Sequence, residues 1–134
     1  MEFIFTADQD NWLNDLEKTQ AKQGTGALHG PSGWCCLGRA CKVAGIIPTR
    51  TDHTRRSTVV NFDGYSTELP PSLVHKLNLR SNTGGIEGAE NYPEIMDSTT
   101  LASLNDMLGW TFKQIARWIR KNPSAVFTSG YEEG

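Results

Sequence analysis

Two neighbouring segments of the 134-residue chain organise its architecture: KQGTGAL at Lys22–Leu28 and WCCLGRAC at Trp34–Cys41. They bring together polar side chains, three glycines, a tryptophan and all three cysteines. Gly24 and Gly26 allow positive φ angles and close approach of other groups to the backbone. The residues from Cys35 to Ala44 are typical of a helix with small side chains. We therefore expect a turn, a tightly packed helix, and a polar pocket where they meet.

Apolar residues at helical spacing predict four further helices on either side of these segments. Two of them carry the capping-box pattern, in which a Thr side chain and a Gln three residues later satisfy each other's backbone N–H groups. These pairs are Thr6 with Gln9 and Thr111 with Gln114. The other two helices are shorter, and we expect them to begin at Ser72 and at Ser98.

A β-hairpin is predicted in the middle of the chain. The segments 57–62 and 65–69 are rich in β-prone residues, and Asp63-Gly64 between them is a strong two-residue turn signal. A second, shorter turn is indicated by Gly30-Pro31-Ser32-Gly33, just before Trp34. We expect loops at 46–56 and 78–93.

These elements indicate a single α+β domain over residues 1–134, in which helices pack on a small antiparallel sheet that includes the hairpin. The length is near the commonest size of one domain, so the chain can bury a sizeable core without a metal or a disulfide. The tail from Ser124 to Gly134 is expected to fray.

Composition excludes several classes of protein. The formal net charge of -2 argues against general binding of duplex DNA, which needs a basic face. No segment approaches the ~20 apolar residues of a membrane span, and the first residues lack the basic region of a signal peptide. We therefore expect a cytoplasmic protein with three reduced cysteines and no membrane partner.

The cysteines are expected to act as small buried hydrophobic side chains. Cys35 and Cys36 point in different directions on a helix, and the chain has neither a Cys-x-x-Cys pair nor zinc-finger spacing of its histidines. The sequence therefore predicts no metal and no cofactor. A cysteine nucleophile would need His29 or His75 brought near as its base, and no family signature of that chemistry is present.

Several motifs, spread in order over most of the chain, resemble a family of small phage- and prophage-encoded proteins. They are Lys22-Gln23-Gly24-x-Gly26-x-Leu28, Cys35-Cys36-Leu37-Gly38-x-x-Cys41, Leu69-Pro70, and Leu101-x-x-Leu104-Asn105-Asp106-x-x-Gly109-x-x-Phe112-x-x-Ile115-Ala116-x-x-Ile119. The resemblance implies a viral accessory gene. Small phage proteins of this kind are often host-takeover or anti-defence factors, and some of these sequester nucleotide-derived immune signals.

The candidate ligand site lies around the glycine turn. Lys22 offers a charge, Gln23 an amide, and Gly24 lets a ligand approach the backbone. Arg39 could hold a phosphate through two hydrogen bonds, and Trp34 could stack on a base. The alternative interpretation is a tight turn with Arg39 in a surface salt bridge.

Further candidates lie elsewhere in the chain. Arg55 and Arg56 belong to a basic loop that would suit a nucleotide or an acidic partner. Asn105 and Asp106 are poor helix formers inside an amphipathic helix, so their presence needs a reason. Either they contact a ligand, or they brace the Lys22 turn from below.

The resemblance, taken with the candidate ligand site, implies a phage-encoded binding protein, not an enzyme, that captures a nucleotide-derived immune signal in the host cytoplasm and so inhibits antiviral defence. One alternative is an inhibitor that grips a host defence protein. Another is a small DNA-binding regulator, because 104–119 has the outline of a helix-turn-helix with Lys113, Arg117 and Arg120 outward. A pocket shared between subunits of a homo-oligomer also remains open.

Overall fold

The computed structural model describes residues 2–54 and 57–131, and for 50–54 and 57–59 it describes the backbone alone. The chain forms helices and two small antiparallel sheets of two strands each, so the α+β prediction is confirmed. In chain order the elements are α1 (Ala7–Lys18), β1 (His29–Gly30), β2 (Gly33–Trp34), α2 (Cys36–Val43), β3 (Pro48–Thr54), β4 (Ser57–Phe62), α3 (Pro71–Leu77), the 3-10 turns η1 (Ala89–Asn91) and η2 (Pro93–Ile95), α4 (Leu101–Asp106), α5 (Phe112–Lys121) and α6 (Pro123–Val126).

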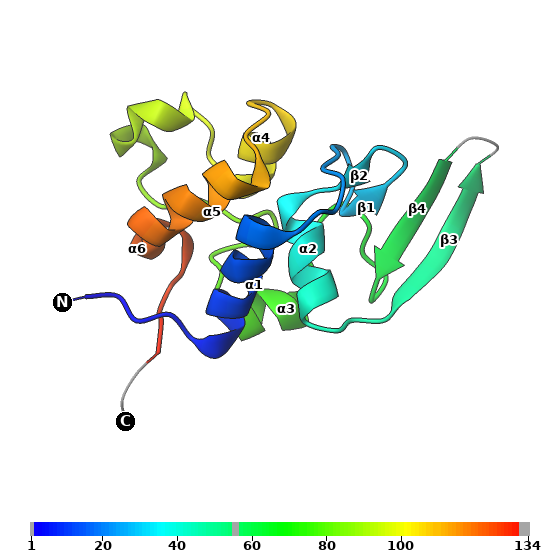
Figure 1. Ribbon diagram of the computed structural model, residues 1–134, viewed down its shortest axis with the longest axis horizontal. Coiled ribbons are helices and arrows are strands. Elements are labelled where there is room, and N and C mark those ends of the chain that lie inside the picture. Colours follow the sequence, from blue (N-terminus) through cyan, green and yellow to red (C-terminus); the bar gives the residue numbers. More distant parts are fainter. Residues whose placement is uncertain (1, 55–56, 132–134) are drawn as a thin grey trace.

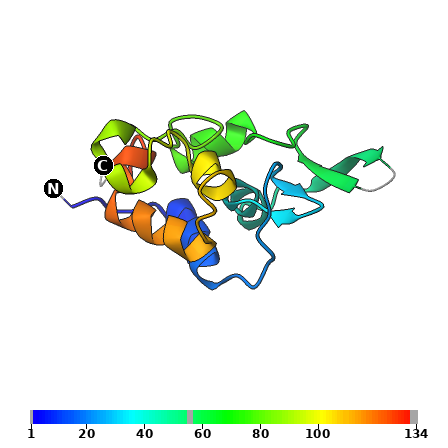
Figure 2. The same ribbon diagram turned by 90° about the horizontal axis from the view of Figure 1, so that it is seen from above.

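The helices form a body at one end of the molecule, and the β3–β4 hairpin projects from the other end (Figure 1). The same separation is seen from above (Figure 2). Helix α1 lies against both α2 and α5, and the core between them contains fully buried side chains from all three helices. These are Trp12, Leu13, Leu16, Cys36, Leu37, Cys41, Ile115, Ala116 and Ile119.

Helix ends form largely as the sequence predicts. Both capping boxes are present, Thr6 with Gln9 at α1 and Thr111 with Gln114 at α5. Helix α4 begins two residues later than expected, because Thr100 rather than Ser98 accepts the backbone N–H of Ser103. Capping by a hydroxyl satisfies a donor that has no partner within the helix.

Helix α2 approaches the preceding segment as closely as its small residues predict. The backbone of Leu28 passes so near Gly38 that a methyl group at that position would overlap the Leu28 carbonyl. The same carbonyl accepts the backbone N–H of Cys35, directly before the helix. The close packing of α2 therefore depends on a glycine for space rather than for a positive φ angle.

The hairpin pairs differently from the prediction. The tight turn at Asp63-Gly64 forms, with φ angles of 57° and 89°, yet it joins Phe62 to Tyr65 by a single bridge. The long partner of β4 is β3, in a segment expected to be a loop, with an irregularity between Arg50 and Asp52. The residues after the turn are used elsewhere, because the carbonyl of Ser66 accepts the N–H of Leu28 and Leu69 donates to Asn82.

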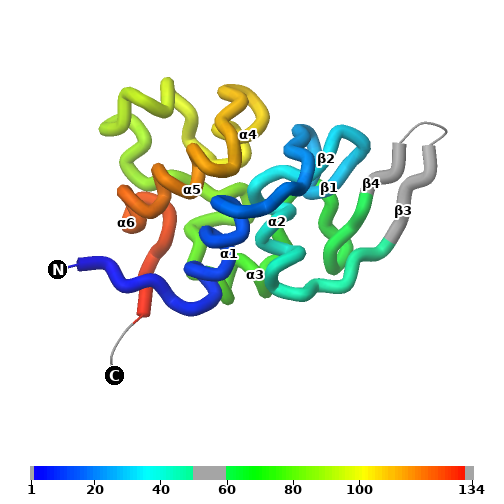
Figure 3. Tube along the Cα trace, in the orientation of Figure 1, coloured from blue at the N-terminus to red at the C-terminus, as the bar shows by residue number. Residues whose placement is uncertain are grey.

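The tail is not frayed over its described residues, which corrects the expectation for the segment from Ser124 onward. Ala125, Val126 and Phe127 are buried. Backbone hydrogen bonds join Thr128 to Asn78 and Tyr131 to Ile4, so the tail runs beside the start of the chain (Figure 3). The apolar Ala-Val-Phe run overrides the general tendency of chain ends to fray.

The buried amide of Gln9 fastens the first helix to this tail. Its Nε2 donates to the carbonyl of Leu77, at 3.0 Å, and to that of Ser129, at 2.9 Å. The ring of Phe127 also meets that of Trp12 edge-on, with 6.2 Å between centroids. Among the described helices, none is both long and apolar enough to cross a membrane.

We expect Phe127→Ala to lower the free energy of unfolding by about 3–5 kcal/mol, because truncating a fully buried aromatic side chain loses burial and leaves a cavity. Tyr131→Ala removes an aromatic side chain that is 56% exposed, and should change stability by less than about 0.5 kcal/mol. Urea unfolding followed by circular dichroism measures both variants. Equal stability of the two would show that the tail does not contribute to the core.

Candidate functional site

The predicted polar cluster around the Lys22 turn is assembled, and Asn105 lies at its centre, 1% exposed. The Nδ2 of Asn105 donates to the Gly24 carbonyl and to Asp106 Oδ1, each at 2.8 Å. Its Oδ1 accepts from Gln23 Nε2 at 2.8 Å and from the Cys36 backbone N–H at 3.2 Å. An amide group offers two donors and two acceptor lone pairs, so the whole capacity of Asn105 is used.

Gln23 is occupied in the same way. Its Nε2 also donates to the carbonyl of Trp110 at 2.7 Å, and its Oε1 accepts the backbone N–H of Phe112 at 3.1 Å. The side chain thereby holds the α4–α5 connection and the start of α5 against the turn. Asp106 completes the cluster, because its Oδ2 accepts the N–H of Gly26 at 3.2 Å. These contacts confirm the interpretation that Asn105 and Asp106 brace the turn from below.

Gly24 is required by the protein's own packing. A side chain there would collide with the backbone of Ser32 and Gly33, which pass over the turn. The backbone around Gly24 pairs with β2, since Gly24 donates to the Trp34 carbonyl and Trp34 donates to the Lys22 carbonyl, both at 2.8 Å. The space that the glycine creates is therefore filled by the chain itself.

Arg39 forms a two-pronged ion pair instead of an open phosphate clamp. Its Nε and Nη2 donate to the two carboxylate oxygens of Asp15 on α1, at 2.8 and 2.7 Å. The guanidinium carbon also lies 4.9 Å from the centroid of the Trp34 ring. Arg39 is 9% exposed, so this is a buried link between helices rather than the surface salt bridge of the alternative interpretation. A ligand would have to displace Asp15 to use this charge.

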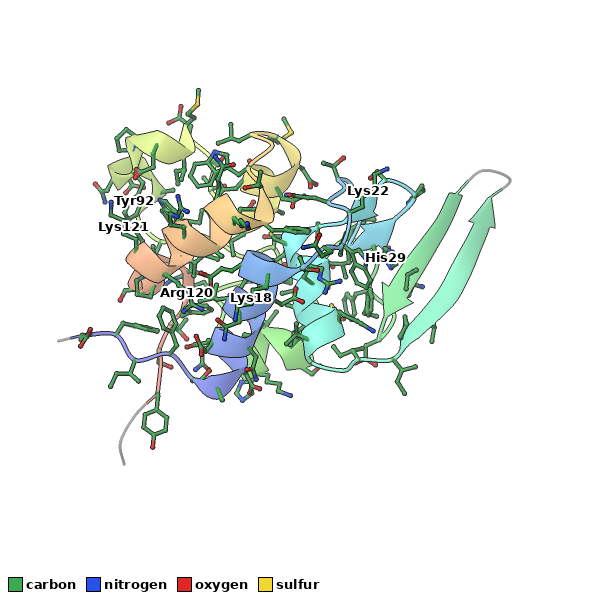
Figure 4. The ribbon with its side chains drawn as sticks, in the orientation of Figure 1. Lys18, Lys22, His29, Tyr92, Arg120 and Lys121 are labelled. Carbon is green, nitrogen blue, oxygen red and sulfur yellow. The ribbon has the colours of Figure 1, made fainter. Side chains whose placement is uncertain are left out.

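The remaining predicted residues differ in accessibility. The Lys22 side chain is exposed beside β2 (Figure 4). Arg55 and Arg56 lie outside the described residues. All the other predicted site residues gather around the Lys22 turn: Lys22, Gln23, Gly24, Trp34, Arg39, Asn105 and Asp106.

A cavity of about 470 Å³ lies on the other side of Trp34, at the base of the projecting hairpin. Its walls come from β1 and β2, from the end of α2 and the segment after it, and from the start of β3 and the end of β4. The lining residues are His29, Trp34, Lys42, Gly45, Ile46, Ile47, Pro48, Val60 and Phe62. The cavity is thus apolar, with one cation and one imidazole.

An aromatic stack forms one wall of this cavity. His29 and Trp34 are register partners of β1 and β2, and their rings are parallel within 10° and 3.7 Å apart. Burial, together with the nearby Arg39 guanidinium, lowers the pKa of His29, so this imidazole is neutral at pH 7. The ring of Phe62 lies 6.0 Å from that of Trp34. Among the described residues of the predicted site, Trp34 is the one that lines this cavity.

His29, Lys42 and Phe62 are not among the ligand-binding residues predicted from the sequence. For His29 a usable signal exists, because residues that flank a short turn such as 30–33 face each other across the strands. No sequence signal identifies Lys42 or Phe62, because the cavity depends on how the β3–β4 hairpin is placed relative to α2.

The cysteine side chains are buried, as expected, and their burial makes the thiols poorly reactive. Burial raises the pKa of Cys35 to about 11 and that of Cys41 to about 12, and raises that of Cys36 well above its usual range. Cys35 also caps α2, because its Sγ accepts the N–H of Gly38 at 3.3 Å. Over the described part of the chain, no three His, Cys, Asp or Glu side chains are grouped so that they could hold a metal ion.

Asn105→Ala is expected to lower the free energy of unfolding by about 3 kcal/mol, because buried groups of Gln23, Gly24 and Cys36 lose their partner. Lys22→Ala, at the exposed edge of the same turn, should stay within about 0.5 kcal/mol of the wild type. Chemical denaturation of both variants tests this. An Asn105→Ala variant as stable as the wild type would reject the bracing role.

The thiols of the folded protein should be almost unreactive at pH 8. With a pKa of about 11, only about one Cys35 thiol in a thousand is the reactive thiolate at that pH. We expect Ellman's reagent to label three thiols in denaturant and fewer than one within minutes in buffer. Rapid labelling of one thiol in the folded state would contradict this and reopen the nucleophile hypothesis.

Residues 7–123 match the model of the family described as "Domain of unknown function (DUF8296)", and the chain belongs to that family. No curated protein and no solved structure matches the chain significantly.

Proposed function

We propose that this protein is a phage-encoded binding protein that captures a nucleotide-derived immune signal in the host cytoplasm, without turning it over. The single observation that carries the proposal is the cavity at the hairpin base. There the Trp34 ring, already stacked on His29, lies beside an apolar wall and one lysine.

The cavity combines the contacts that a nucleotide requires. Its volume of about 470 Å³ is within the range of small-ligand sites. Aromatic rings bind a base through its flat face, and Trp34 lies in the wall of the cavity with the buried ring of Phe62 beside it. The Lys42 ammonium supplies a point charge for a phosphate, and a neutral imidazole such as His29 can both donate and accept a hydrogen bond. Capture needs only shape, stacking and charge.

The proposed binding site is this cavity, and not the surroundings of the Lys22 turn where the sequence predicts a ligand site. Gln23 and Asn105 have their hydrogen bonds occupied within the protein, and Arg39 is paired with Asp15, so they support the wall behind Trp34 rather than contacting the ligand. Their contribution to binding is to hold the turn and β2 in place. A rigid support of this kind preserves affinity, because less order has to be gained on binding.

A second candidate function is the inhibition of a host protein through the projecting hairpin. Apart from the single bridge between Phe62 and Tyr65, β3 and β4 form strand pairs only with each other in the described part of the chain, so no third strand extends their sheet. Free edges can add a strand from another protein. Ile47, which is 81% exposed at the hairpin base, would be covered by such a partner.

DNA recognition is less favoured. In a helix-turn-helix protein the first residues of the second helix contact base edges. Here the start of α5 is packed against the Lys22 turn, since Phe112 is buried and its N–H is bonded to Gln23.

A thermal-shift screen against cyclic mononucleotides, cyclic dinucleotides and ADP-ribose derivatives tests the proposal. A ligand at a hundred times its dissociation constant stabilises the protein by about 2.7 kcal/mol, which is several degrees of Tm. We expect Lys42→Ala to lose most of this shift. Lys18→Ala, an exposed lysine at the end of α1 that does not line the cavity, should keep it.

Mass spectrometry of the released ligand separates capture from catalysis, because a captured signal returns unchanged. A shift that Lys42→Ala leaves intact would place the site elsewhere. If none of these nucleotides shifts the Tm, nucleotide capture is rejected and a protein partner is favoured. Such a partner would be sought by a pull-down with the intact protein.

A further inference from the structure

A second cleft lies on the outer face of α5, at the end of the helical body away from the hairpin. Tyr92 and Lys121 mark this end in Figure 4, and His29 lies on the far side of the body from them. The cleft has a volume of about 280 Å³ and is lined by Glu94, Trp110, Gln114, Arg117, Trp118 and Lys121. None of these residues lines the cavity at the hairpin base.

Two indole rings give the cleft its apolar surface. Trp118 is 6% exposed, and Tyr92 packs edge-on against it with 5.1 Å between ring centroids and an angle of 82°. Trp110, in the connection between α4 and α5, is half-buried, and its carbonyl is fixed by Gln23. The ring of Trp118 is therefore held in position by packing, and the backbone of Trp110 by Gln23, before any ligand is present.

Trp118 also has a donor without an acceptor. Its Nε1 is buried, and no described residue accepts its hydrogen. Trp12, the other deeply buried tryptophan, donates its Nε1 to the Cys36 carbonyl at 2.9 Å. Buried indole N–H groups usually find a partner, so Trp118, which lines the cleft, is an exception among the described residues.

Two cationic side chains line the cleft together with this apolar surface. Arg117 and Lys121 are four residues apart on α5, hence on the same helix face, and both are exposed. In the described part of the chain neither has an ion pair, whereas Arg120 on the same helix is paired with Asp10 and Glu17. Glu94 is the only acidic residue among the described residues that line the cleft. The cleft thus presents unpaired positive charge next to two aromatic rings.

We propose that this cleft binds a small aromatic anion. The ring lies against Trp110 and Trp118, where aromatic surfaces gain from stacking and edge contacts. The anionic group, a carboxylate or a phosphate, lies at Arg117 and Lys121. The size of the cleft restricts the ring to one or two fused cycles. This site is independent of the proposed nucleotide capture at Trp34.

The four tryptophans make the proposal directly measurable. In a 15N-labelled sample, the indole N–H groups of Trp12, Trp34, Trp110 and Trp118 give separate NMR signals, which single Trp→Phe variants assign. Indole-3-acetate and phenyl phosphate are the probes for the carboxylate and the phosphate. We expect at least one of them to shift the signals of Trp110 and Trp118 and to leave that of Trp34 in place.

Three further compounds separate a ring-plus-anion site from a charged surface. Tryptamine has the ring with a positive charge, while acetate and inorganic phosphate have the charge without a ring. All three should shift the same signals at least about tenfold more weakly, because each lacks one of the two contacts. Equal shifts with acetate or inorganic phosphate would overturn the proposal, as would shifts confined to Trp34 or no shift with either aromatic anion.

Charge variants on exposed positions complete the test without touching the core. The double variant Arg117→Gln, Lys121→Gln should weaken binding about tenfold or more, and Glu94→Gln should tighten it about twofold to fivefold. Lys113→Gln is the matched control, since it removes an exposed cation from the same helix outside the cleft. If Lys113→Gln weakens binding as much as the double variant, the attraction is that of the whole helix, and the cleft is not a site.

Discussion

The buried amide of Asn105 fixes the relation between the parts of this molecule. It joins the Lys22 turn, the start of α2 and the end of α4 through four hydrogen bonds, with every donor and acceptor used. A buried polar network of this kind specifies one arrangement, because any shift of one segment leaves polar groups unpaired. The position of β2, and with it Trp34, follows from this network.

Arg39 and Gln9 also join elements of the fold through hydrogen bonds of their side chains. Arg39 links α2 to α1 through Asp15, and Gln9 links α1 to a carbonyl at the end of α3 and to one in the tail. Three polar side chains that a sequence pattern would place on a surface or in a binding site thus connect elements distant in the chain. The protein uses them as cross-links between helices that are mostly short.

Local features could be predicted from the sequence and nonlocal ones could not. Each capping box and the tight turn at Asp63-Gly64 depend on residues within four positions of one another, so they are visible in the pattern. The strand partner of 57–62 depends on where the following residues bond, and Ser66 bonds to Leu28. The order of the tail likewise depends on distant contacts of Phe127, whose ring packs against Trp12 and whose backbone pairs with Leu79.

The candidate site shows the same limit in another form. The pattern predicts Gln23, Arg39 and Asn105 as ligand-binding residues, yet a ligand-binding residue and a structural one have the same side chain. What distinguishes them is whether their donors and acceptors are already occupied, which is a property of the folded chain. The cleft on α5 was hidden for the opposite reason, because Trp118 at helical spacing is indistinguishable from any other core residue.

One wall of the cavity at Trp34 belongs to the β3–β4 hairpin, which projects from the helical body (Figure 1). Because the cavity lies between the helical body and this hairpin, which acts as an arm, its volume depends on the angle between the two. The affinity for anything held there therefore includes the free energy of placing the arm, and scales with the fraction of molecules in which the arm is correctly placed. The binding of any ligand there and the position of β3 and β4 are therefore thermodynamically linked, so each favours the other.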